Sequence, residues 1–207
     1  MAPAAYRLVV LLLWGLAIHD TIACRGLFWD GTAFLVNLIE NRTFHDFYPA
    51  RAHVGWVTQL PVLLAIWLGV TDTHLLAMLQ SAALFALPVG LYHLALARVR
   101  RDPVMAAVVL AVIALVFLPT SFFIVGEYNA AYAAVTASMA IMLTGGANRR
   151  RDALIVLALG AMCLRSYEAM VYLGPLMAAA VLWWRHGLPR DDDVARMTAT
   201  LAALTFV

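Results

Sequence analysis

Lysine is absent from this chain of 207 residues, so its 14 basic residues are all arginines. Charged residues make up only 13% of the sequence, about half the share that is usual in soluble domains. This scarcity excludes a soluble domain, a nucleic-acid-binding protein and a disordered tail. The chain has only two cysteines, Cys24 and Cys163, so neither a disulfide framework nor a thiolate metal site can form.

Several enzyme signatures are also missing. The sequence contains no Walker loop, no H-E-x-x-H, no G-x-S-x-G and no GxGxxG pattern. Soluble nucleotide and hydrolase chemistries therefore have no support. We predict no metal ligands, the cofactor stays unknown, and a divalent metal has no support in the sequence.

Hydrophobic residues are abundant, at 64% of the chain with a mean hydropathy of +0.86. Since a spanning helix needs roughly 20 apolar residues, the composition predicts an all-α fold: a polytopic bundle of transmembrane helices, in one domain over residues 1–207. We expect membrane lipid as a partner and no nucleic acid. The predicted spans lie near residues 8–24, 74–97, 103–125, 130–146, 153–165, 169–184 and 197–207. The last is too short to cross, so we expect the chain to continue beyond Val207.

Arginines gather between the later spans, in three clusters that lie two spans apart. The positive-inside rule places all three clusters on the cytoplasmic side, and turns such as 126–129 and 165–168 on the outer side. Lysine-free composition suggests a GC-rich bacterial genome, hence a bacterial inner membrane. The clusters are Arg98/Arg100/Arg101, Arg149/Arg150/Arg151 and Arg185/Arg190/Arg196.

The segment at residues 54–70 has two readings. If it crosses the membrane, twelve arginines lie inside and two outside; if it lies along the outer interface, the division is ten to four. Charge counting favours crossing. The tryptophans, the polar Thr58-Gln59 pair and Pro61 are instead typical of an interfacial helix. The residues alone leave both readings open.

Polar residues concentrate in three places. The first is a loop of about 30 residues, 24–53, which carries Asp30 and an apolar ladder of Phe34, Leu35 and Leu38 that predicts a short amphipathic helix. His19 and Asp20, at the end of the first span, either join the same cavity or only mark the end of that span. Alternatively, the loop is only a solvated connection between two spans and has no functional role.

The second place is the turn with Glu127, and the third is the stretch from Arg165 to Glu168. Glu127 is either an exposed turn residue or a carboxylate that faces a shared cavity. Arg165 and Glu168 either pair on one helix face or line a polar path in the membrane. Three polar patches on one side predict a site at that membrane surface. Its expected substrate-binding residues are His45, Asp46, Tyr48, Arg51, His53, Arg165, Tyr167 and Glu168.

The order of these features resembles the GT-C superfamily of glycosyltransferases that use lipid-phosphate sugars. A first span precedes the motifs Phe28-Trp29-Asp30-Gly31 and Phe47-Tyr48-Pro49. These motifs are followed by an apolar segment, then by a span that ends in Arg-x-Arg-Arg, and then by a span that ends in Glu127. The resemblance covers roughly residues 6–150. It implies a long first outer loop with interfacial helices, and it favours the interfacial reading of residues 54–70.

The same resemblance implies a function. Asp30 would match the family's catalytic carboxylate and Glu127 the acid of the second outer loop. A carboxylate can take the proton of an acceptor hydroxyl, while Arg51, His53 or Arg165 can stabilise the departing phosphate. The chain would then transfer a sugar from a polyprenyl-phosphate donor at the periplasmic face. The alternative is a non-catalytic polytopic protein: a flippase, a transporter or an assembly partner in envelope polysaccharide synthesis.

Overall fold

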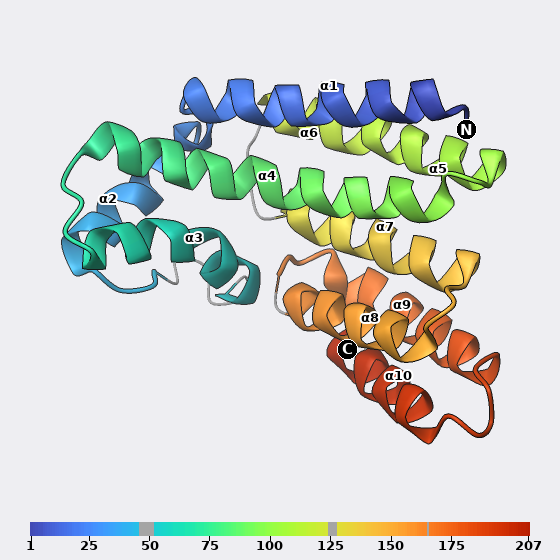
Figure 1. The fold of residues 1–207 in the computed structure, drawn as a ribbon. Coiled ribbons are helices and arrows are strands. Elements are labelled where there is room, and N and C mark those ends of the chain that lie inside the picture. The colour runs from blue at the N-terminus through green and yellow to red at the C-terminus, as the bar shows by residue number, and fades with distance from the viewer. Residues whose placement is uncertain (46–51, 124–127, 165) are drawn as a thin grey trace.

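The computed structural model describes residues 1–45, 52–123, 128–164 and 166–207, except the side chains of residues 52–54 and 122–123. These residues form helices and no strand (Figure 1). Three helical stretches are long and apolar enough to cross a membrane: Pro3–Ile22, Thr73–Val99 and Pro103–Ser121. The predicted all-helical fold is confirmed, with three helices of spanning length.

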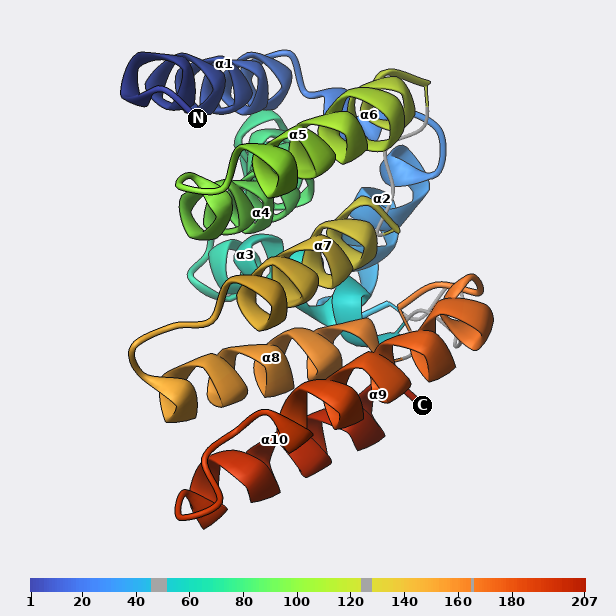
Figure 2. The ribbon, with the colours of Figure 1, turned by 90° about the vertical axis from the view of Figure 1, so that its right-hand side faces the viewer.

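Helix α4 (Thr73–Val99) lies at the centre of the fold. It begins at Asp72, whose carboxylate accepts hydrogen bonds from the backbone N–H groups of His74 and Leu75 at 2.9 and 3.2 Å. Its buried residues include Phe85 and Tyr92. Helices α1 (Pro3–Ile22) and α7 (Tyr128–Thr144) pack against α4, as Figures 1 and 2 show from two sides.

Helices α1 and α4 are antiparallel neighbours. The amino group of Met1 donates to the carbonyl of Arg100 at 2.8 Å, just beyond the end of α4. At the other end of α1, the backbone N–H of Gly26 donates to the hydroxyl of Ser81 at 2.9 Å, near the start of α4. The chain between α1 and α4, residues 23–72, therefore leaves and returns at the same end of this helix pair.

The third long stretch combines α5 (Pro103–Val112), a π-helical turn (Ile113–Phe117) and α6 (Leu118–Phe123). Asp102 caps α5, and Pro103 at its first position suits a helix start. The π turn ends two residues before Pro119, which has no N–H to continue the α-helical hydrogen bonding. A widened turn at this point accommodates the missing donor.

Helix α7 is followed in the later part of the chain by α8 (Arg149–Cys163), α9 (Met170–His186) and α10 (Asp193–Thr205). Helix α7 presents alanines such as Ala133 and Ala137 to the core, which lets it approach α4 closely. Helices α8 and α10 begin four residues before the predicted spans because Asn148 and Asp192 cap them.

Residues 25–45 and 52–67 fold into a smaller unit around α4's first half. It contains a 3₁₀ turn, η1 (Arg25–Leu27), and helices α2 (Gly31–Asn41) and α3 (Ala52–Trp67). Leu35 and Leu38 of α2 pack with Val62 and Leu63 of α3 in a core separate from the main one. The predicted amphipathic helix is confirmed as α2. Helix α3 ends at Trp67, three residues before the predicted end of the apolar segment, and Gly69 follows with a φ of 87°.

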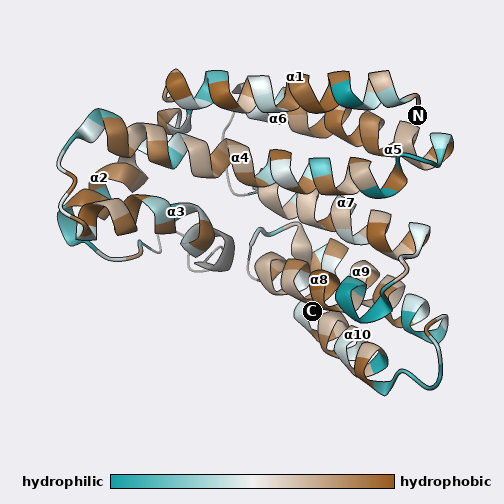
Figure 3. Cartoon of the chain, in the orientation of Figure 1, coloured by the Kyte–Doolittle hydropathy of each residue, from teal (hydrophilic) through white to brown (hydrophobic). Residues whose placement is uncertain are grey.

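Contacts between arginines and their partners define the two ends of the fold. Arg98 lies 2.5 Å from Asp152 of α8, Arg150 lies 2.8 Å from Asp192, and the Arg185 side chain donates to the Arg196 carbonyl. The three arginine clusters therefore gather at one end, which we call the arginine-rich end. The end where α1 meets η1 and α4 begins is the opposite end. Hydrophilic colour marks the turn between α4 and α5 in Figure 3.

Candidate functional site

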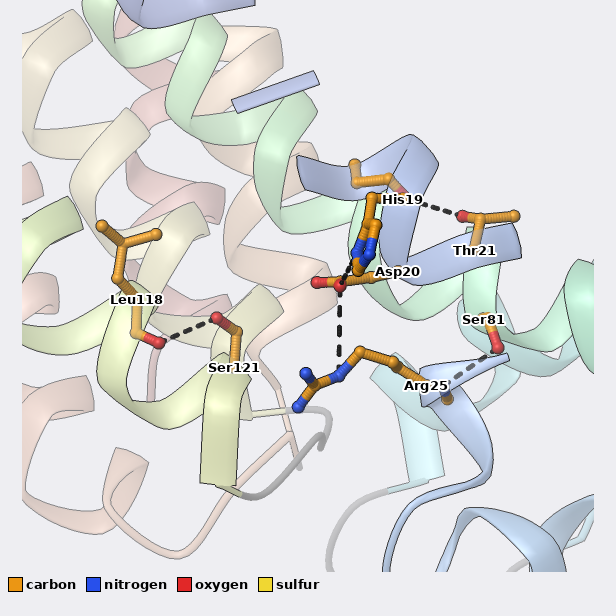
Figure 4. A network of polar contacts seen from close by, with 9 residues as sticks. His19, Asp20, Thr21, Arg25, Ser81, Leu118 and Ser121 are labelled. Atoms are coloured by element: carbon orange, nitrogen blue, oxygen red, sulfur yellow. Dashed lines mark hydrogen bonds and ion pairs between the residues drawn. The ribbon is translucent and has the colours of Figure 1, made fainter. Parts of the chain in front are cut away.

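A buried charge stands at the opposite end, where α1 stops. Asp20 is only 3% exposed although it belongs to an apolar helix. Its carboxylate lies 3.0 Å from His19 Nδ1 and 3.9 Å from Arg25 Nε. Figure 4 shows the Arg25 guanidinium extending toward α6, the helix that carries Ser121. A buried carboxylate needs such partners, because an unpaired charge there would be strongly unfavourable.

Two glycines fix the chain that follows against α4. A Cβ on Gly26 would lie 2.7 Å from the Cα of Ser81, and a Cβ on Gly31 would overlap the Gly26 carbonyl oxygen. The absence of side chains lets Gln80 donate to the Gly31 carbonyl at 2.7 Å, while Ser81 accepts from Gly26. This docking sets the position of the segment between the two glycines and of Asp30 beside Gly31.

Asp30 occupies the position before α2 where an aspartate normally caps a helix. Its side chain accepts no capping hydrogen bond, and its own backbone is helical with φ −74° and ψ −13°. Among the described residues its half-buried carboxylate has no hydrogen bond or ion pair. The preceding residue, Trp29, has a left-handed φ of 59° and is 71% exposed. Such backbone outliers in non-glycine residues cluster at functional sites.

His45 marks the end of the polar stretch after α2. Its backbone N–H donates to the Gln59 side chain at 2.9 Å, and Gln59 donates back to the His45 carbonyl at the same distance. The ring of His45 lies 6.3 Å from that of Phe34, measured between centroids. Trp67 donates to the Arg42 carbonyl at 3.0 Å. These contacts hold α2 and α3 together as one unit that carries both Asp30 and His45.

Tyr167 and Glu168 lie in the turn between α8 and α9. The ring centroid of Tyr167 lies 5.5 Å from that of Tyr128 and 6.1 Å from that of Tyr132, near the start of α7. Glu168 is exposed, and both residues line an open cavity of about 360 Å³ together with Met170. Since α3 contacts α8, the unit that carries Asp30 adjoins the helix that leads into this turn.

Several predicted site residues fall outside the described residues: Asp46, Tyr48, Arg51, Glu127 and Arg165. His53 belongs to α3, but its side chain is likewise not described. That Asp30 and Glu127 share one cavity therefore stays a prediction, and both readings of Arg165 and Glu168 stay open.

The structure adds residues that the sequence interpretation left out of the site or, for Asp20, left open. Asp20 and Arg25 form a buried charged cluster, and Gln80 and Ser81 fix the loop that carries Asp30. An aspartate inside an apolar run was the available sequence signal for Asp20. Within the described part of the chain, no group of three or more His, Cys, Asp or Glu side chains is placed to hold a metal ion.

Comparisons with family models, with curated proteins and with solved structures found no match to this chain.

Proposed function

We propose that this chain is a GT-C-like membrane glycosyltransferase, which transfers a sugar from a polyprenyl-phosphate donor at the periplasmic face of a bacterial inner membrane. The observation that carries the proposal is the antiparallel pairing of α1 and α4. Because of this pairing, the chain between α1 and α4 starts and finishes at the same end of the two helices. A large first outer loop requires this arrangement.

Membrane insertion is supported by the outward faces of the long helices. Leu8, Leu11 and Leu12 of α1 are 58%, 69% and 63% exposed, and Leu115 is 76% exposed. Contiguous apolar surface of this kind is unfavourable in water and suits a lipid environment. The positive-inside rule then assigns the arginine-rich end to the cytoplasm and the opposite end to the periplasm.

The length of α3 is compatible with a position outside the hydrocarbon core. Its 16 residues cover about 24 Å at 1.5 Å per residue, less than a hydrocarbon core of about 30 Å. A single crossing by α3 would also make α1 and α4 run in the same direction across the membrane, whereas they are antiparallel. In our proposal α3 therefore lies at the periplasmic surface with α2.

The proposed reaction uses the carboxylate of Asp30. It accepts the proton of the acceptor hydroxyl, whose oxygen forms a bond to the anomeric carbon of the sugar. The bond from that carbon to the phosphate oxygen breaks, and the polyprenyl phosphate leaves with the electron pair. Positive groups from the loop, such as Arg51 or His53, and Arg165 stabilise the charge on the departing phosphate.

The decisive experiment replaces Asp30 by Asn in cells that depend on the protein. We expect loss of glycan modification in the envelope fraction, measured by mass spectrometry, with protein level unchanged. Asp72→Asn is the matched control, since Asp72 precedes a helix at the same end but serves as its cap. Normal glycan modification in the Asp30→Asn strain would refute the proposal.

Topology can be tested separately by labelling a cysteine at Thr43 in a chain without Cys24 and Cys163. We expect reaction with a membrane-impermeant reagent once only the outer membrane has been opened. Protection of this cysteine until the inner membrane is opened would place the loop in the cytoplasm and rule out the glycosyltransferase function.

The buried Asp20–Arg25 cluster favours a second candidate, a non-catalytic protein that moves a lipid-linked sugar. Ionisable residues buried in membrane helices often line substrate paths. In that case flux of the lipid-linked sugar would fall in Asp20→Asn, would be unchanged in Asp30→Asn, and no glycosylated product would form.

A further inference from the structure

A basic cavity lies at the arginine-rich end, at the opposite end of α1 from Asp20. It has a volume of about 330 Å³, within the range of small-molecule sites. It lies between the start of α1 and the turn that joins α4 to α5. The lining residues are Met1, Pro3, Tyr6, Arg7, Arg100 and Arg101.

The three arginines give the cavity a net positive charge. Arg7, Arg100 and Arg101 are exposed, and none of them forms an ion pair within the described part of the chain. The adjacent acid, Asp102, is engaged elsewhere, because its carboxylate accepts the backbone N–H groups of Val104 and Met105, both at 3.0 Å. Three like charges around one cavity repel each other, and a bound anion relieves that repulsion.

A chain of hydrogen bonds leaves a further donor free on Tyr6, one of the residues that line the cavity. The indole Nε1 of Trp14 can only donate, and it does so to Nδ1 of His93 at 3.3 Å. Nδ1 therefore carries no proton, and the proton of the neutral imidazole is on Nε2. Nε2 donates to the hydroxyl oxygen of Tyr6 at 3.0 Å. The hydroxyl hydrogen of Tyr6 is then left to donate to a ligand in the cavity that Tyr6 lines.

We propose that this cavity binds the phosphate of an anionic phospholipid headgroup. Guanidinium groups and a hydroxyl donor match the oxygens of a phosphate. A lipid is the source that fits best, because the exposed leucines Leu8, Leu11 and Leu12 follow Arg7 along α1 and offer a surface for the acyl chains. Basic pockets between membrane helices on the cytoplasmic side bind such headgroups. The site is independent of the proposed glycosyl transfer, which is assigned to the opposite end.

The test uses the purified chain in nanodiscs of phosphatidylcholine and phosphatidylglycerol. Native mass spectrometry counts the phosphatidylglycerol molecules that stay bound after release. We expect retention to fall roughly tenfold or more in Arg100→Ala/Arg101→Ala. The matched control is Arg149→Ala/Arg151→Ala, which removes the same charge at the same end but from outside the cavity, and should retain the lipid as the unchanged chain does. Equal loss in both double variants, or no loss in the first, would overturn the proposal.

Tyr6→Phe keeps every charge and removes only the hydroxyl, so it tests the hydrogen-bond donor on Tyr6 without altering the net charge. We expect a several-fold lower retention of phosphatidylglycerol, and retention equal to that of the unchanged chain would refute the role of Tyr6. Soluble glycerol phosphate distinguishes the two sources of the anion. Failure to displace the lipid supports a headgroup site, whereas displacement at equal concentration would overturn the lipid assignment in favour of a free phosphate compound.

Discussion

Asp30, at the opposite end of the fold, differs from the paired aspartates of the arginine-rich end. At the arginine-rich end, Asp152 pairs with Arg98, and Asp192 both caps α10 and pairs with Arg150. At the opposite end, Asp30 stands at a helix start but makes none of these contacts. Carboxylates that hold helices together are committed to structure, whereas one that forms no contact in the described residues is available to a substrate.

The largest expected effect concerns the ion pair that joins α4 and α8. Asp152 is buried at 2% exposure, and Arg98 lies against it. Asp152→Asn leaves the guanidinium without its counter-charge, which should lower the free energy of unfolding by about 3 kcal/mol. Denaturant unfolding of the purified protein measures this change in the free energy of unfolding. Asp193→Asn, at an exposed aspartate in the first turn of α10, is the control and should change stability by less than about 0.5 kcal/mol. Similar losses in both would show that the pair has no special role.

Next in size is the docking of the loop at the opposite end. Gly31→Ala places a methyl group on the Gly26 carbonyl, so the backbone must shift, at a cost of roughly 1–3 kcal/mol. If Asp30 is catalytic, glycan transfer falls as well, because its position depends on this docking. Gly15→Ala in α1 is the control, since nothing lies within 4 Å of its added Cβ, and it should stabilise the helix by up to about 1 kcal/mol. A Gly31→Ala protein with normal stability would contradict the close packing.

The contrast between a capping and a non-capping aspartate can be measured directly. Asp72→Ala removes two capping hydrogen bonds from α4 and should cost about 1 kcal/mol. Asp30→Ala removes no capping bond, so we expect less than about 0.5 kcal/mol of change in stability. Equal destabilisation would mean that Asp30 has a structural role and would weaken its assignment as the base.

The smallest effect is a pH dependence at Asp192. The hydrogen bond from the Ala195 backbone N–H, with a further contribution from Arg150, lowers the pKa of its carboxyl below the usual range. Because the folded pKa is lowered, the stabilisation is present above the ordinary carboxyl pKa and is lost as the pH falls through the lowered value. Melting temperatures of the unchanged chain and Asp192→Asn should therefore converge in acid. The Arg150→Gln variant should keep most of this pH dependence of the melting temperature. Complete loss of the pH dependence in Arg150→Gln would show that the ion pair with Arg150 is the main cause of the lowered pKa.

The sequence predicted the elements that depend on local patterns. Helices α4 and α5 begin within a residue of their predicted starts, since Asp72 and Asp102 cap them and long apolar runs follow. Helix α1 instead begins five residues before the predicted span, at Pro3, because a helix can start ahead of its apolar run when proline occupies its first position. The lengths of the later helices were less predictable, as they depend on caps such as Asn148.

The site was predictable only in part. Asp30 was predicted as a site residue from its place in a long polar loop. That its side chain makes no capping hydrogen bond depends on the backbone conformation around Trp29, which no local sequence pattern shows. The burial of Asp20 is a tertiary property, because it arises only when η1 folds back on α4 and brings Arg25 to the end of α1. Pairing between such distant residues cannot be read from spacing along the chain.

The antiparallel contact between α1 and α4 also sets an order of events during synthesis. Only Leu13, Ala17 and Asp20 of α1 are buried, and α1 packs chiefly on α4. A ribosome makes all of residues 23–72 before α4 appears, so in the proposed membrane arrangement α1 must wait in the bilayer with this narrow face uncovered. During that interval the carboxylate of Asp20 has no protein partner beyond its neighbours in the chain. We therefore expect the translocon or a membrane chaperone to shelter nascent α1 until α4 arrives.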